Sequence, residues 1–193
     1  MLTPTTEIEA VNTLLESIGE SPVSNAEDNG NVDAIHARNV LRRTSREVQG
    51  RGWHFNTEKN YRLLPDTQGN IYLPSNVLRA DTVGDSVDQD VVVRGVRLYN
   101  RKDHSYSFTA PVFLDMVVYL AFSELPEAVR YYIVCRATRI FQRNAVGSDA
   151  IGRYSERDEI LALVALQDYE AETADYNVLT GSTSVSNVLQ RTI

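Results

Sequence analysis

The sequence predicts an α+β fold, in which a bundle of four main helices carries an inserted antiparallel β-rich lobe and an extended C-terminal tail. Apolar residues recur at helical spacing in two segments near the start of the chain and in two segments beyond its middle. Between them lie short β-prone stretches separated by Pro, Gly, Asn or Asp. We therefore expect a helical body from residues 1–56 and 124–179, a lobe from residues 57–123 and a tail over residues 180–193.

The first helix is expected over Thr5–Ile18, where apolar residues lie on one side of a helix. Thr5 or Thr6 can cap its start. Gly19 supplies its end, because a residue without Cβ adopts the left-handed cap conformation at little cost. A connector rich in turn-forming residues follows.

The second helix is expected over Val32–Gln49, and its arginines form a broad polar face. These residues are Arg38, Arg42, Arg43 and Arg46. The face could hold nucleic acid or an acidic partner, but we favour a solvated face paired with nearby carboxylates. The net charge of −7 and the pI near 5.0 argue against a protein that grips phosphates. A net negative charge is explained either by ordinary solubility or by a channel wall that repels DNA.

Short stretches in the middle of the chain are expected to form an antiparallel sheet. They are Tyr61–Leu64, Ile71–Leu73, Val77–Val83, Val91–Val93, Val96–Tyr99, Tyr106–Phe108 and Phe113–Leu120. The tightest hairpin is expected at a two-residue loop of Arg94 and Gly95, because glycine supports the turns that match strand twist. The run Phe113–Phe122 is apolar on both faces, which fits a central strand or a buried helix.

Two long helices joined by a short turn are expected to form an antiparallel hairpin near the end of the chain. Pro126 opens the first helix, where its missing N–H costs little, and Gly147 ends it. Ser148 or Asp149 can cap the second helix, which runs to about Tyr176. Its expected interior residues are Ile160, Leu161, Val164, Ala165 and Leu166.

The tail beyond Leu179 has the composition of a linker followed by a few apolar residues. Val188, Leu189 and Ile193 cannot bury much surface alone. Such a tail is either disordered or ordered by docking on a neighbour, and the returning apolar residues favour docking.

The sequence predicts no catalytic, metal or cofactor site and no membrane span. The three histidines lie in unrelated segments, without zinc spacing, a triad or a phosphate loop. Cys135 is expected to be buried filler. A glycosidase needs two carboxylates flanking a sugar, but Glu156, Asp158 and Glu159 are better explained by their place near a helix start. The longest apolar run, Val117–Phe122, is too short to cross a bilayer.

Five motifs follow one another along the chain. They are Ser17–Val23, Ala37–Leu41, Arg51–Asn56, Leu125–Val134 and Asp175–Leu179. Their residues and order resemble those of the tail tubular protein A family, the head-to-tail adaptors of short-tailed bacteriophages. The resemblance spans most of the chain and is strongest over the first 60 residues and around residues 125–145.

The resemblance implies a structural protein of the virion tail, assembled in the host cytoplasm. It implies a ring of twelve identical subunits between the portal of the capsid and the tail nozzle, which is tail tubular protein B. The phage DNA would pass through this ring without specific binding. The alternative function is a polysaccharide (glycoside) hydrolase activity on the same subunit.

Structural anchors are expected where the helices change direction or meet the lobe. Gly19 and Pro22 fix the exit from the first helix. Gly52 lets Trp53 turn into the core beside Phe55, so that Trp53 joins the helices to the sheet.

Contacts with the portal, the nozzle or neighbouring subunits are expected from the hairpin and from the tail. A ring needs heterologous interfaces, in which one patch meets a different patch on the next copy. The candidate interaction residues are Arg94, Gly95, Tyr176, Asn177, Val188, Leu189 and Ile193.

Overall fold

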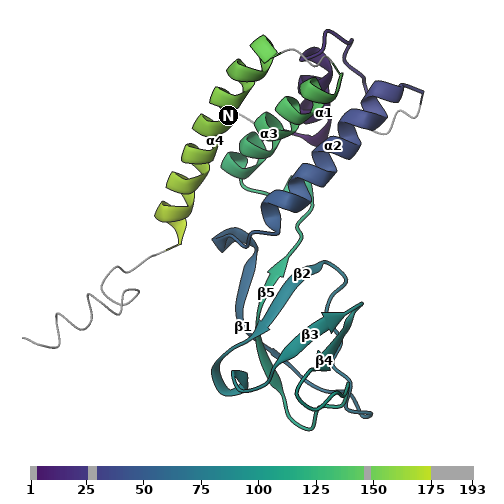
Figure 1. Ribbon diagram of the computed structural model, residues 1–193, viewed down its shortest axis with the longest axis vertical. Coiled ribbons are helices and arrows are strands. Elements are labelled where there is room, and N and C mark those ends of the chain that lie inside the picture. Colours follow the sequence, from purple (N-terminus) through teal and green to yellow (C-terminus); the bar gives the residue numbers. More distant parts are fainter. Residues whose placement is uncertain (1–3, 26–29, 146–148, 175–193) are drawn as a thin grey trace, which may run out of the picture.

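A computed structural model describes residues 4–25, 30–145 and 149–174, with only the backbone for residues 149–155 (Figure 1). Its helices are α1 (Glu7–Glu16), α2 (Val32–Gln49), α3 (Glu127–Ala145) and α4 (Asp149–Thr173). Its strands are β1 (Thr57–Leu63), β2 (Val77–Thr82), β3 (Val91–Arg94), β4 (Arg97–Asn100) and β5 (Val112–Val118). Short 3-10 helices are η1 (His54–Asn56), η2 (Gly84–Ser86) and η3 (Phe122–Glu124). The α+β prediction is confirmed, since these strands all lie between α2 and α3.

Helix α1 begins at a capping box. The Thr6 hydroxyl accepts a hydrogen bond from the Glu9 N–H at 3.3 Å, and the Glu9 carboxylate accepts one from the Thr6 N–H at 2.7 Å. The helix ends at Glu16, so it is two residues shorter at each end than expected. Gly19 follows with a φ of +83°, which is the left-handed conformation predicted for it.

Helix α2 has the bounds that its periodicity predicted. The Asn31 side-chain oxygen caps it by accepting hydrogen bonds from the N–H groups of Asp33 at 2.9 Å and Ala34 at 3.0 Å. Its buried side packs on α1 and α3. The largest fully buried side chains of the resulting bundle core are Leu14, Leu15, Leu41, Tyr132, Ile133, Phe141 and Leu166.

The lobe contains a three-stranded antiparallel sheet in the order β1-β5-β2 and a separate β3-β4 hairpin. Strand β5 lies in the centre of the larger sheet, so the apolar run near residue 113 is a strand and not a helix. The lobe has its own core. Its buried members are Ile71, Leu73, Leu98, Phe108, Val112, Leu114 and Met116.

Two of the expected strands are wrong. Residues 71–73 form only one isolated bridge, between Tyr72 and Arg97. Pro74 follows and has no N–H with which to extend a ladder. Residues 106–108 form no strand either, although Phe108 is buried in the lobe core. In both stretches the apolar side chains are buried in the lobe core, but the backbone does not pair continuously with another strand.

The β3–β4 hairpin loop is shifted by one residue from the prediction. Arg94 pairs with Arg97 in the strands, so the two-residue loop is Gly95 and Val96. Gly95 has a φ of +64°, as the first residue of a type II′ turn requires. Arg94 therefore belongs to β3, where its side chain has a fixed direction.

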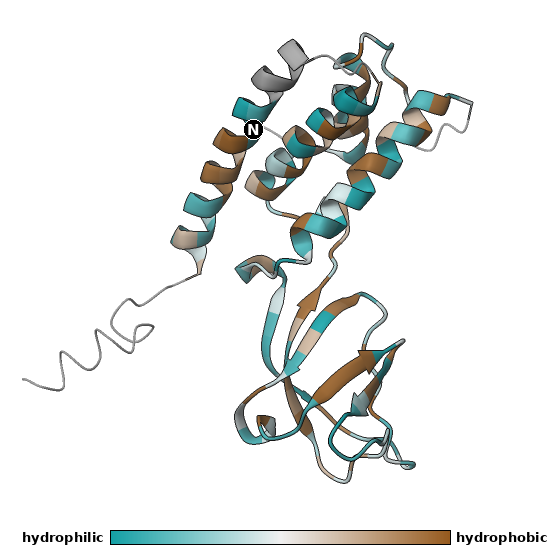
Figure 2. Ribbon diagram, in the orientation of Figure 1, coloured by the Kyte–Doolittle hydropathy of each residue, from teal (hydrophilic) through white to brown (hydrophobic). Residues whose placement is uncertain are grey.

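Of the five residues that were expected in the interior of α4, the structure buries only Leu166. Ala162 and Leu166 are fully buried, but Ile160, Leu161, Val164 and Ala165 are exposed. The middle of α4 carries hydrophobic residues (Figure 2). The helix packs on α3 through a side that also contains the buried Glu159. The prediction is correct for Leu166 and wrong for the other four residues, because the most apolar side of the helix does not face its own bundle.

The ends of α3 and α4 agree in part with expectation. Helix α3 starts directly after Pro126, and Asp149 begins α4. Gly147, Ser148 and Tyr176, which were expected to bound these helices, lie outside the described residues. No helix in the described part of the chain is long and apolar enough to cross a membrane.

Candidate functional site

One face of the β3–β4 hairpin carries arginine and tyrosine side chains. The register pairs Arg94 with Arg97 and Val92 with Tyr99. Alternate residues of a strand share a face, so Arg94, Arg97 and Tyr99 lie on the same face. The bridge from Tyr72 to Arg97 brings a further aromatic ring to the edge of β4.

These side chains form what we name the arginine–tyrosine ladder, in the order Arg94, Tyr99, Tyr106, Arg97 and Tyr72. The guanidinium carbon of Arg94 lies 3.6 Å from the centre of the Tyr99 ring. The rings of Tyr99 and Tyr106 meet edge to face, with centres 4.8 Å apart. The guanidinium carbon of Arg97 lies 4.3 Å from the centre of the Tyr106 ring and 5.8 Å from that of Tyr72. These contacts hold the ladder in one arrangement, because a cation is attracted to an aromatic face.

Asn70 orients Arg97 from a neighbouring turn. Its side-chain oxygen accepts a hydrogen bond from the Arg97 guanidinium. The Asp66 carboxylate closes the turn by accepting the N–H groups of Gln68 and Asn70, both at 2.8 Å. The Asn70 N–H lowers the pKa of Asp66 most strongly, and Arg97 lowers it further. The Asn70 side chain, which accepts the hydrogen bond from Arg97, thus also donates to the Asp66 carboxylate.

The ladder has the composition of a recognition surface. Arg94 is exposed, the Tyr72 side chain is 52% exposed, and Val96 at the hairpin tip is 46% exposed. Tyrosine and arginine are enriched at binding hot spots, since each offers a large area together with hydrogen-bond donors. Its guanidinium groups and phenols offer hydrogen-bond donors next to aromatic rings, which is chemistry suited to contact with a partner.

A second feature is the junction between α2 and β1, where three of the expected anchors lie. Gly52 has a φ of +79°, and a Cβ placed on it would lie 2.9 Å from Cγ2 of Val117. The indole N–H of Trp53 donates to the Val48 carbonyl at 2.8 Å. Trp53 and Phe55 are partly buried against the bundle core. Glycine is required at position 52 by both its conformation and its space.

Two buried side-chain amides, Gln49 and Asn56, tie this junction to the end of β5, and we name them the amide clasp. The Gln49 side chain donates to the Leu120 carbonyl at 3.0 Å and accepts the Leu120 N–H at 2.8 Å. The Asn56 side chain donates to the carbonyls of Val118 and Gln49, both at 2.9 Å, and accepts the Trp53 N–H at 2.9 Å. The clasp pairs with backbone groups at the end of α2 and at the end of β5, where regular secondary structure stops.

Comparison with known proteins decides the family. The family model described as tail tubular protein matches residues 8–176, which include both the hairpin and the junction.

The chain belongs to the tail tubular protein family.

One relative is tail tubular protein A of Klebsiella phage KP34. It is 29% identical to this chain over 164 residues, which cover 84% of this chain and 86% of the relative. As a tail tubular protein, the chain is a structural component of the virion tail. The resemblance of the five motifs to this family is confirmed.

The basic face of α2 in this tail tubular protein is only partly solvated. Arg38 is buried, and its Nε and Nη2 atoms have no hydrogen-bond partner among the described residues. Arg42 pairs with Glu7 of α1 at 3.2 Å. Arg43 and Arg46 are exposed and form no ion pair with any described residue. Ion pairs with nearby carboxylates were expected for all four arginines, and among the described residues only Arg42 forms one.

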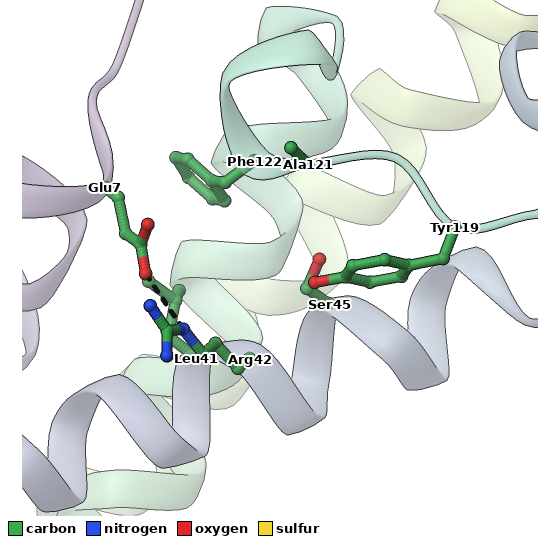
Figure 3. Close-up of a pocket in the computed structure, with 7 residues that line it drawn as sticks. All are labelled: Glu7, Leu41, Arg42, Ser45, Tyr119, Ala121 and Phe122. Atoms are coloured by element: carbon green, nitrogen blue, oxygen red, sulfur yellow. Dashed lines mark hydrogen bonds and ion pairs between the residues drawn. The ribbon is translucent and has the colours of Figure 1, made fainter. Parts of the chain in front are cut away.

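A small pocket borders this face, next to the Arg42–Glu7 ion pair (Figure 3). Its volume is about 200 Å³, and Leu41, Tyr119 and Phe122 supply its apolar lining. Ser45 and Tyr119 add hydroxyl groups beside the ion pair. The pocket is large enough to accept an apolar side chain.

Of the carboxylates that a glycosidase could use on α4, Glu159 is the buried one. Glu159 accepts hydrogen bonds from Arg136 at 2.8 Å and from Arg139. Arg136 also pairs with Glu47 of α2 at 3.6 Å. Glu159 is thus occupied by two cations that join α3 to α4. Over the part of the chain with described side chains, no cluster of three His, Cys, Asp or Glu residues could hold a metal ion.

Cys135 is expected to react slowly with iodoacetamide. Burial raises the pKa of its thiol above the ordinary value and outweighs a hydrogen bond with Tyr131, while Asp158 and Glu159 raise it further. Because the thiolate is the reactive form, alkylation at pH 8 should be about tenfold slower in the native protein than in urea. Mass spectrometry of timed samples measures both rates. Equal rates would contradict the assignment of Cys135 as a packed, protonated thiol.

Of the remaining expected site residues, Pro22 lies in the described part of the chain. Pro22 is exposed in the connector after α1, next to Val23, which is held by two hydrogen bonds to the Asn12 side chain. Tyr176, Asn177, Val188, Leu189 and Ile193 lie outside the described residues. The tyrosines of the ladder and the two amides of the clasp were missed from sequence, although Asn56 falls inside a family motif.

Proposed function

We propose that the protein is a ring-forming adaptor that joins the portal of the capsid to the tail nozzle and forms part of the channel for DNA ejection. Membership of the tail tubular protein family supports a tail role. The net charge of −7 supports a channel wall that DNA passes without sticking. The proposed partners are further copies of the chain, twelve in all by the resemblance, the portal protein and tail tubular protein B.

The observation that carries the proposal is the arginine–tyrosine ladder at the end of the molecule away from the helical bundle (Figure 1). A surface that is ordered before binding loses little side-chain entropy on contact. The lobe can therefore hold one tail component while the bundle contacts others. We propose the helical body and the lobe as two separate interaction units, with the tail from residue 180 as a third.

Replacing Arg94 with alanine should weaken binding of the portal or the nozzle about tenfold, which is the effect of losing a modest hot spot. Arg94→Ala removes the exposed end of the ladder without touching either core. Arg101→Ala is the matched control, since Arg101 is an exposed arginine of the same lobe, paired with Asp90 at 3.6 Å. Light scattering after size exclusion, with each purified partner, measures the complexes.

The wild type and Arg101→Ala should form a ring-sized species, and Arg94→Ala should need a higher concentration to do so with one partner. Equal binding by all three proteins would remove the ladder from the contact. A wild type that stays monomeric with both partners would overturn the adaptor proposal. No observation favours the polysaccharide hydrolase alternative, because Glu159 is already held by two arginines.

A further inference from the structure

The outward side of α4 is more apolar than a surface helix should be. The side chains of Ile160, Leu161 and Val164 are 56%, 58% and 47% exposed, respectively. A surface helix normally turns such residues toward its own core, whereas α4 buries the ion-paired Glu159. A contiguous exposed apolar patch marks a surface that binds a partner.

Acidic residues extend this patch along the helix. Asp168 lies one turn after Val164, and Glu172 lies one turn further on the same side. Both carboxylates are exposed and pair with no described cation. We name Ile160, Leu161, Val164, Asp168 and Glu172 the α4 outer face. A complementary surface must offer apolar contact next to positive charge.

Such a surface exists on α2 of the same chain. Arg43 and Arg46 are its exposed arginines without an ion pair among the described residues. Arg42, one turn before Arg46, lines the apolar pocket of about 200 Å³ (Figure 3). We name these arginines and the pocket the α2 basic face. It offers the positive charge and the apolar pocket that would complement the carboxylates and apolar side chains of the α4 outer face.

The two faces cannot meet within one subunit. Helices α4 and α2 both pack on α3 and lie on opposite sides of it (Figure 1). Two different patches on opposite sides of a subunit are what a head-to-tail ring requires, because each copy then contacts two neighbours.

We propose that the α4 outer face of one subunit docks on the α2 basic face of the next subunit. This inference rests on the proposed ring and assigns its lateral interface. The apolar residues of α4 supply the contact area, and Asp168 and Glu172 meet Arg43 and Arg46. Opposite charges at the edge of the contact fix which surfaces pair.

Two full-length variants block one face each. Leu161→Arg places a charge in the α4 outer face, and the double variant Arg43→Glu/Arg46→Glu reverses the α2 basic face. Val87→Arg is the control for the first, because Val87 is a 67% exposed apolar residue of the lobe. Arg101→Glu is the control for the second. Self-association is followed by light scattering in the condition, with or without portal, in which the wild type assembles.

Each blocked variant should need more than about tenfold higher concentration for half-assembly, while both controls assemble like the wild type. A mixture of the two blocked variants should form pairs that do not grow, since each retains the face that the other lacks. Thermal melting checks that each variant is folded, and Val164→Gln replaces Leu161→Arg if that variant is not.

Different failures have different meanings. If the wild type and both blocked variants form rings equally well, the face assignment is wrong and the ring stands. If Leu161→Arg fails but the α2 variant assembles, the α4 outer face meets another surface, and the assignment of α2 is wrong. A wild type that remains monomeric with and without portal would overturn the ring and this interface together.

Discussion

Replacing Gln49 with leucine should lower the free energy of unfolding by about 2–4 kcal/mol. The Gln49 side chain is fully buried and forms hydrogen bonds with both backbone groups of Leu120. Leucine fills a similar volume but pairs with neither group, so the Leu120 N–H and C=O would stay buried without partners. Each such group costs about 1–3 kcal/mol.

Urea unfolding followed by tryptophan fluorescence measures this effect, because Trp53 is the single tryptophan of the chain and lies at the same junction. Gln68→Leu is the matched control, since Gln68 is exposed in a turn and should change stability by less than about 0.5 kcal/mol. If Gln49→Leu and Gln68→Leu unfold at the same urea concentration, the amide clasp does not stabilise the junction.

Replacing Trp53 with alanine should cost about 3 kcal/mol, near the lower end for aromatic truncations because the ring is only partly buried. The change removes packing against the bundle core and the hydrogen bond to the Val48 carbonyl. Trp53→Phe keeps most of the packing and loses the hydrogen bond, so it should cost about 1 kcal/mol.

Circular dichroism in urea compares the three proteins, because fluorescence is lost with the tryptophan. The order of stability should be wild type, Trp53→Phe and Trp53→Ala. A Trp53→Ala variant with unchanged unfolding would show that the indole does not join the helices to the sheet.

Local signals predicted much of the fold. The periodicity of α2 and the left-handed Gly19 were read correctly, because helix ends depend on neighbouring residues and on backbone conformation. The turn at Gly52 and Trp53 was also predicted, since a glycine before a large aromatic residue is a local signal. The central place of β5 followed from a run that is apolar on both faces.

Features that depend on contacts across the chain were not predicted. The arginine–tyrosine ladder joins Tyr72 and Tyr106 to a hairpin that neither belongs to, so no spacing in the sequence reveals it. Gln49 looks like any polar helix residue until Leu120 is placed beside it. The hairpin register was wrong by one residue because either loop position satisfies the same glycine.

The error at α4 has a different origin. Periodicity identifies which side of a helix avoids water, but it does not say which chain covers that side. The exposed Ile160 and Leu161 show the apolar pattern of a buried face. Under the proposed interface, the apolar side of α4 is indeed a buried face, but a neighbouring subunit covers it and not the bundle of its own subunit.

The amide clasp restrains the lobe relative to the helical bundle. Within the described residues, the chain passes between the bundle and the lobe at two places, before β1 and after β5, and Gln49 and Asn56 bind the second crossing to the first. The lobe cannot swing about this neck without breaking buried hydrogen bonds. Under the proposed ring, a force on the hairpin tip would tilt the lobe and the base of α2 together, and each tilting subunit would move its neighbours.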